Sequence, residues 1–111
     1  MNYSDGSRRI AIIPVYHQVG TIGKVLAKFA NPAVNEICLV VDCPTERLLQ
    51  EIEIASREIK IPIHIIKNSR RMGVGYAIRE GIKYALDNGY DTIVVMAGND
   101  KDDPREIPRL L

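Results

Sequence analysis

Three carboxylates lie close together near the end of the chain and suggest a ligand site. Asp100, Asp102 and Asp103 come shortly after a run of β-branched and apolar residues, 92–96. Such a run is typical of a strand that is buried on both faces. Carboxylate oxygens are the ligands that Mg²⁺ and Mn²⁺ prefer. Asp100 and Asp102 are therefore candidate metal ligands, with a solvated acidic turn as the alternative.

Asp103 has a competing role as a helix cap. It precedes Pro104, a residue favoured at the first helical position, and Glu106 follows at the spacing of a capping box. We therefore expect a helix to begin here and Asp103 to cap it.

A second group of candidates is basic. Arg70 and Arg71 precede Gly73 and Gly75, at the predicted start of a helix. Guanidinium groups and a helix N-terminus together favour an anion, although a solvated basic turn fits the same residues. The dinucleotide fingerprint is excluded because Ile78 stands where that motif needs a small residue. No lysine follows the glycines as a P-loop requires.

Two further loops carry polar side chains after apolar runs. Tyr16 could stack on a base or sugar and Gln18 could hydrogen-bond to it, although a surface turn explains both residues. Asp42 ends another apolar run. Its carboxylate could accept a hydrogen bond from a base N–H or a ribose hydroxyl. It could equally cap the turn or helix that follows.

Alternating strands and helices would position these loops. The patterns predict strands at residues 9–15, 36–41, 61–67 and 92–96, and helices at 21–30, 45–58 and 73–88. This βαβαβαβ order predicts a three-layer α/β fold with a parallel, Rossmann-like sheet. Ligands bind such sheets beyond the carboxyl ends of the strands. The four loops above would therefore converge.

Two details of the elements are open to test. Pro62, near the start of the third strand, favours an edge position because proline cannot donate to a ladder. The last helix should face the sheet with one set of side chains. These are Ala77, Ile78, Gly81, Ile82, Ala85 and Leu86.

Composition limits the class of protein. The 111 residues predict one domain, 1–111, with an ordered core over 9–111. A net charge of +1 and the absence of Trp argue against a nucleic-acid partner. No apolar run approaches the length of a transmembrane helix, and the N-terminus lacks a signal-peptide core. The chain has only two cysteines, Cys38 and Cys43, so a disulfide framework is not expected. A cytoplasmic location is expected instead.

Four segments together resemble a known family. They are IPVYHQ at 13–18, VVDCPT at 40–45, KNSRRMGVGYAIREG at 67–81, and residues 96–111. The sequence resembles the N-terminal, nucleotide-binding half of a family-2 glycosyltransferase with a GT-A fold. The nearest subgroup is that of dolichol-phosphate mannosyltransferases and polyprenyl-phosphate glycosyltransferases. The resemblance covers the chain from about residue 8 to its end.

The resemblance implies a ligand and roles for named residues. A UDP-, GDP- or dTDP-linked sugar would lie across the strand ends, for transfer to a polyprenyl phosphate or another acceptor. The implied nucleotide-binding residues are Pro14, Tyr16 and Gln18 at the base or ribose, Asp42 at the base, Arg71, Gly73 and Ala77 along the pocket, and Ala97, Gly98 and Asn99 at the diphosphate.

The chain departs from the family at several places. The metal-binding D-x-D of the family is Ala97-Gly98-Asn99 here, which weakens the case for a metal, and Val41 replaces a carboxylate. The acceptor half and its catalytic base are not in these residues, so the catalytic residues are unknown, and the chain is expected either to be a truncated gene product or to work with another chain. The rival hypotheses are a non-catalytic nucleotide-binding module and a fragment that functions only as a homo-oligomer. A lipid-linked acceptor would bring a cytoplasmic chain to the membrane.

Overall fold

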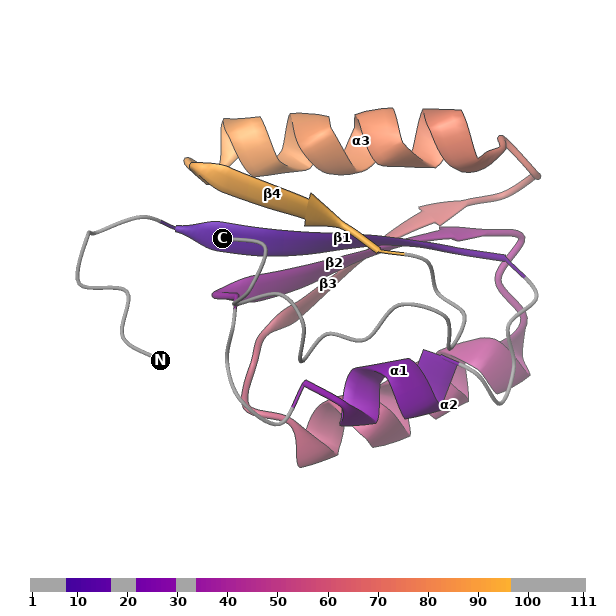
Figure 1. Cartoon of the computed structure of the whole chain (residues 1–111). Helices are drawn as coiled ribbons and strands as arrows, with labels where there is room; N and C mark the ends of the chain where they lie inside the picture. The colour runs from indigo at the N-terminus through magenta and orange to yellow at the C-terminus, as the bar shows by residue number, and fades with distance from the viewer. Residues whose placement is uncertain (1–7, 17–21, 30–33, 97–111) are drawn as a thin grey trace.

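The protein is a three-layer α/β sandwich. The computed structural model describes residues 8–16, 22–29 and 34–96. The elements are β1 (Arg9–Val15), α1 (Ile22–Ala27), β2 (Glu36–Asp42), α2 (Glu46–Glu58), β3 (Ile63–Asn68), α3 (Val74–Asp87) and β4 (Thr92–Val95). All pairings are parallel, in the order β3-β2-β1-β4. Helices α1 and α2 lie on one face and α3 on the other (Figure 1). The predicted fold class is confirmed.

The sheet is apolar on both sides because helices cover both faces. On β1, Ala11, Ile13 and Val15 pack toward α1 and α2, while Ile10 and Ile12 pack toward α3. All five are at most 2% exposed. This double burial explains why β1 and β2 are continuous apolar runs rather than alternating ones.

Pro14 lies in a central strand without breaking the sheet. Its Cα partner in β2 is Val40, whereas pairing between β1 and β4 ends at Ile12 and Val95. The Ile12 carbonyl accepts from Met96 N at 2.9 Å, so even-numbered residues of β1 turn their backbone groups toward β4. The N–H that Pro14 lacks would thus point past the last paired residue of β4, where no ladder bond is lost.

Three local expectations are corrected and one is confirmed. Strand β3 forms an edge of the described sheet, as Pro62 predicted, but begins at Ile63. Val95 is 43% exposed, so burial of the fourth strand on both faces is wrong there, because Val95, unlike Ile93 on the same face, is not packed into the core beneath α3. Leu86 is 65% exposed and was wrongly placed inward. The inward row of α3 is Ala77, Gly81 and Ala85, spaced four apart, and Leu86 falls outside it.

The first helix is shorter than expected within the described residues. It covers Ile22–Ala27, and the predicted ends at Thr21 and Ala30 lie outside the described residues. The same is true of the helix expected to begin at Asp103.

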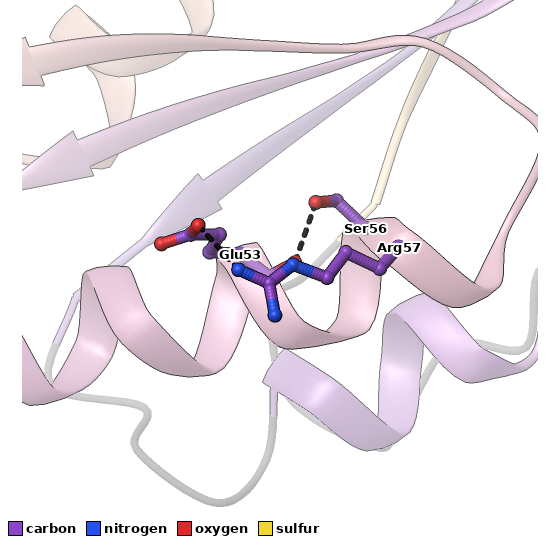
Figure 2. A network of polar contacts seen from close by, with 3 residues as sticks. All are labelled: Glu53, Ser56 and Arg57. Atoms are coloured by element: carbon purple, nitrogen blue, oxygen red, sulfur yellow. Dashed lines mark hydrogen bonds and ion pairs between the residues drawn. The ribbon is translucent and has the colours of Figure 1, made fainter.

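Helix α2 is held by its cap and its buried face. The Thr45 hydroxyl accepts from Leu48 N at 3.1 Å, as an N-cap does. Figure 2 shows the solvent side, where Arg57 pairs with Glu53 at 2.8 Å and the Ser56 hydroxyl donates to the Glu53 carbonyl at 2.7 Å. Both charged side chains are more than 60% exposed, so water screens the pair to about 0.3–0.5 kcal/mol at most.

The C-terminal end of α3 is tied to the start of β2 by a carboxylate. Tyr84 and Tyr90 both donate their phenolic hydrogens to Glu36, Tyr84 at 2.5 Å. Burial raises the pKa of Tyr90 to about 12, and the hydrogen bond to Glu36 adds to the rise. The ring of His64 stacks on Tyr84 with 4.1 Å between centroids. Gly89 then ends the helix segment with a positive φ of 76°.

A close approach between α3 and β1 predicts a sensitive glycine. A Cβ on Gly81 would lie 2.4 Å from Ile12 Cγ2, and Ile12 is fully buried. Gly81→Ala should lower the free energy of unfolding by about 1–3 kcal/mol because a packed core resists added volume. Urea unfolding would measure the change.

Gly75→Ala is the matched control on the same helix. A Cβ there meets nothing within 4 Å. Gly75→Ala makes the unfolded chain less flexible, which should raise the free energy of unfolding by about 0.5–1 kcal/mol. Equal effects of the two substitutions would contradict the packing argument.

Candidate functional site

The carboxyl ends of three strands bring polar and aromatic side chains together. Val15 pairs with Val41, and Asp42 pairs with Asn68, so the loops after β1, β2 and β3 leave the same end of the sheet (Figure 1). This end, where the carboxyl ends of the strands meet, is called the strand-end edge below. Tyr16 follows β1, and the guanidinium of Arg71 lies 4.1 Å from the centroid of its ring. Of the predicted site residues, Tyr16, Asp42 and Arg71 are thus brought to one place.

Asp42 is the centre of this edge. Its Oδ2 accepts from the backbone N–H groups of Met72 at 2.8 Å and Gly73 at 2.9 Å. Its Oδ1 accepts from the side-chain amide of Asn68 at 2.9 Å. The residue is only 5% exposed. One carboxylate therefore fixes the end of β3 and the start of α3 relative to β2.

The amide of Asn68 links this carboxylate to α3. Its nitrogen donates to Asp42 and also to Glu80 Oε1, at 2.8 Å. Neither Asn68 nor Glu80 was identified from the sequence as a site residue. The β2–β3 register sets Asn68 beside Asp42, and no sequence signal specifies that register.

The hydrogen bonds keep Asp42 ionised. Burial disfavours its charged form, but the donors on Asn68, Gly73 and Met72 and the nearby charge of Arg71 outweigh burial. The pKa of Asp42 therefore lies below its ordinary value of 3.8. The ionised carboxylate of Asp42 thus accepts hydrogen bonds from the protein's own N–H groups.

Arg71 lies against an aromatic face. Its guanidinium stacks on half-buried Tyr16, while the arginine itself is exposed. A cation over a ring is worth about 0.5–1 kcal/mol at an exposed site. This weak hold leaves the donors of Arg71 able to bind an anionic ligand.

The other predicted site residues are placed as follows. Pro14 is half-buried in β1, and Gly73 caps α3 with a positive φ of 92°. Ala77 is 2% exposed and packs against the sheet with Ile10 and Ile12. Gln18, Ala97, Gly98, Asn99, Asp100 and Asp102 lie outside the described residues.

A metal ion does not fit the described part of this edge. Residues 8–16, 22–29 and 34–96 contain no group of three His, Cys, Asp or Glu side chains suited to a metal. Both oxygens of Asp42 face N–H donors, which would repel a cation. The candidate ligands Asp100 and Asp102 lie beyond the described residues and stay predictions.

A separate hollow lies away from the strand ends. It encloses about 560 Å³ between α2 and β3. Its lining is mostly aliphatic, including Leu49, Ile52, Ile59 and Ile63. Such a surface offers few convergent polar groups, so the strand ends are the better candidate.

Comparison with known proteins gives the family. The profile described as Glycosyl transferase family 2 matches residues 10–111. The chain belongs to this family. An uncharacterised protein of Methanocaldococcus jannaschii is 32% identical over 103 residues, which are 92% of this chain and 44% of that protein. The undecaprenyl-phosphate mannosyltransferase of Micrococcus luteus is 25% identical over 104 residues, covering 94% of this chain and 43% of its own length.

A solved structure supports the fold. A mannosyltransferase from Pyrobaculum calidifontis, in complex with GDP-mannose and Mn²⁺, superposes with a TM-score of 0.62 at 16% identity. The match covers 70% of this chain and 24% of that one. The present chain, a member of glycosyl transferase family 2, spans less than half the length of the curated relatives that it matches. Within the described residues, no helix has the length and apolarity to cross a bilayer.

A strained residue next to Asp42 predicts a stabilising substitution. Cys43 is a non-glycine residue with a φ of 51°. The left-handed conformation costs a side chain about 1 kcal/mol or more. Cys43→Gly should therefore raise the free energy of unfolding by about 0.5–1 kcal/mol, measured by urea unfolding. Cys43→Ala is the control, because it removes the thiol but keeps the strain, and it should change little.

The depressed pKa of Asp42 predicts a pH-dependent stability. A carboxylate with a lowered folded pKa stabilises the fold fully above 3.8, and this stability is lost as the pH falls through the folded pKa. Asp42→Asn should lower the free energy of unfolding by about 1–3 kcal/mol at pH 6. The difference from the unaltered chain should narrow below pH 3.8.

Urea unfolding at a series of pH values between neutrality and acid would measure this difference. The control is Asp87→Asn, on the exposed last turn of α3. It should change stability little at every pH. A difference for Asp42→Asn that stays constant with pH would contradict the assignment.

Proposed function

We propose that this chain binds a nucleotide sugar at the carboxyl ends of its strands and serves as the donor-binding part of a glycosyltransferase. The observation that carries the proposal is the cluster of Asp42, Arg71 and Tyr16 at the sheet edge. It lies beyond the carboxyl ends of parallel strands, which is the side of such a sheet where α/β proteins bind ligands. Membership of glycosyl transferase family 2 supports the same reading.

The chemistry of transfer assigns roles to these residues. An acceptor oxygen attacks the anomeric carbon, the bond from that carbon to the diphosphate breaks, and the leaving nucleoside diphosphate gains negative charge. Arg71 would stabilise that charge, since its guanidinium is exposed and offers several N–H donors. The free N–H groups of the first turn of α3 would add a positive dipole. Tyr16 would present its ring to the base or ribose.

A divalent cation is part of the proposal only through residues at the end of the chain. Mg²⁺ or Mn²⁺ bound by Asp100 and Asp102 would neutralise the diphosphate. The solved mannosyltransferase contains Mn²⁺. Ala97-Gly98-Asn99 supplies no carboxylate, so any metal would depend on the two later aspartates.

The acceptor is proposed from the relatives. Undecaprenyl-phosphate mannosyltransferase and polyprenol monophosphomannose synthase are the names of two of them. A polyprenyl phosphate is therefore the first acceptor to test. It would place a cytoplasmic reaction at a membrane surface.

A nucleotide-binding module without catalysis is the second candidate. The charge of Asp42 is already used by backbone N–H groups, and the D-x-D position is neutral. Both features leave binding possible while removing groups that catalysis uses in the family. Such a module would act together with another chain, including a second copy of itself.

Ligand binding tests the proposal directly. Thermal shift and titration calorimetry with UDP-, GDP- and dTDP-sugars, with and without Mn²⁺, should reveal binding of at least one. Arg71→Ala should weaken binding about tenfold or more, because a charge-assisted contact is worth about 1.5–3 kcal/mol. Transfer of labelled sugar to a polyprenyl phosphate would separate the enzyme from the binding module.

Arg57→Ala is the matched control. Arg57 is an exposed arginine on α2 that contacts Glu53, so its loss should leave nucleotide affinity unchanged. Equal losses from both arginine variants, or no response to any nucleotide sugar, would refute the proposed function.

A further inference from the structure

The side of helices α1 and α2 that faces away from the sheet carries an open hollow of about 520 Å³. Its walls are joined by a hydrogen bond from Gly23 N to Glu51 Oε2 at 3.3 Å. None of the lining residues is buried, whereas Leu48 and Ile52, which pack toward the sheet from α2, are at most 2% exposed. The lining residues are Gly23 and Ala27 on α1, and Arg47, Gln50, Glu51, Ile54, Ala55 and Glu58 on α2.

Ile54 is a large aliphatic side chain exposed at this hollow. It is 59% exposed, and the residues beside it in the lining include three with small side chains, Gly23, Ala27 and Ala55. One surface therefore offers both an apolar projection and a recess. A second copy of the chain presents the same two features, so each copy would cover the exposed Ile54 of the other.

The charges on either side of Ile54 are arranged for pairing with a second copy of α2. Arg47, Ile54 and Glu58 are called the α2 stripe here, because steps of seven and four residues return to the same face of a helix. Arg47 and Glu58 lie about 16 Å apart along the axis, too far to pair with each other. Within the described ranges, neither of them has an ion-pair partner. In an antiparallel pair of α2 helices, each Arg47 would face the Glu58 of the other copy.

The placement of these two charges does not serve the isolated helix. Arg47 lies in the first turn of α2, and Glu58 is its last residue. The helix macrodipole favours the opposite arrangement, with an acid at the start and a base at the end. An antiparallel contact between two copies gives both charges an opposite partner and places the two Ile54 side chains near the centre of the contact.

We propose that the outer face of α1 and α2 is a homodimer interface with two-fold symmetry, in which α2 packs antiparallel to α2 of a second copy. Arg47 of each copy pairs with Glu58 of the other, and Ile54 of each copy packs against the hollow of the other. The inference goes beyond the proposed function and does not depend on it, because Tyr16, Asp42 and Arg71 do not line this hollow.

Charge reversal tests the interface, with the oligomeric state measured by analytical ultracentrifugation over a range of concentrations. The unaltered chain should show a concentration-dependent dimer. Arg47→Glu and Glu58→Arg should each weaken dimerisation about tenfold or more, because like charges then face each other at both ends of the α2 stripe. Each substitution matches the dipole of α2 better than the original residue, so each variant should stay folded, as circular dichroism would verify.

A mixture of the Arg47→Glu and Glu58→Arg variants tests the antiparallel geometry. One chain of the mixed pair is acidic at both ends of the α2 stripe and the other chain is basic at both ends. The mixture should therefore dimerise about as tightly as the unaltered chain, although neither variant does so alone. The double variant that carries both substitutions should also recover dimerisation, since opposite charges face each other again.

Ile54→Ser tests the apolar part of the contact. It should weaken dimerisation about tenfold or more and leave the free energy of unfolding nearly unchanged, because Ile54 is 59% exposed in the single chain. Glu53→Gln is the control, since Glu53 is an exposed residue of α2 that does not line this hollow, and dimerisation should be unaffected.

Three results would overturn the proposal. The first is a chain that stays monomeric at millimolar concentration, which would leave this face to a different partner. The second is a dimer that neither charge reversal weakens. The third is a mixture of the two single variants that associates no better than either variant alone.

Discussion

The hydrogen bonds of the Asp42 carboxylate are the constraint on which the strand-end edge depends. A single buried charge accepts donors from β3, from the loop after β3 and from the start of α3. Helix α3 lacks a side-chain N-cap of its own, because its N-cap residue is Gly73. Asp42 substitutes for that missing cap from a different strand. The positive end of the helix and the negative carboxylate stabilise each other.

Helix α3 is held at both ends by carboxylates that belong to β2. Asp42 holds its first residues, and Glu36 holds Tyr84 in its last turn and Tyr90 beyond it. Between these points, Gly81 allows the helix to approach β1 closely. Position along the helix axis is thus set by polar contacts at the ends, while distance from the sheet is set by the absence of a side chain. The polar contacts at the ends of α3 and its close approach at Gly81 together orient the start of the helix toward the strand ends.

Much of the fold was predictable because it depends on local patterns. The continuous apolar run at residues 9–15 predicts β1 with its observed bounds, and Thr45 with the residues after it predicts the start of α2. Leu86 was misplaced because an apolar residue near a helical row need not belong to it. The bridge from Asp42 through Asn68 to Glu80 was not predictable. It depends on the β2–β3 register, which local periodicity does not specify.

The departures from the family pattern share one effect, which is a change in the charge at the strand ends. Val41 is fully buried and apolar, and the carboxylate of Asp42 at the end of β2 stays ionised and accepts hydrogen bonds from N–H donors. Arg70 and Arg71 remain exposed beside it. The guanidinium of Arg71 therefore offers N–H donors to an anion at a place that also holds the carboxylates of Asp42 and Glu80. Val41 and Ala97-Gly98-Asn99 stand where the family has carboxylates, so the chain carries fewer negative charges at these positions and would repel a diphosphate less.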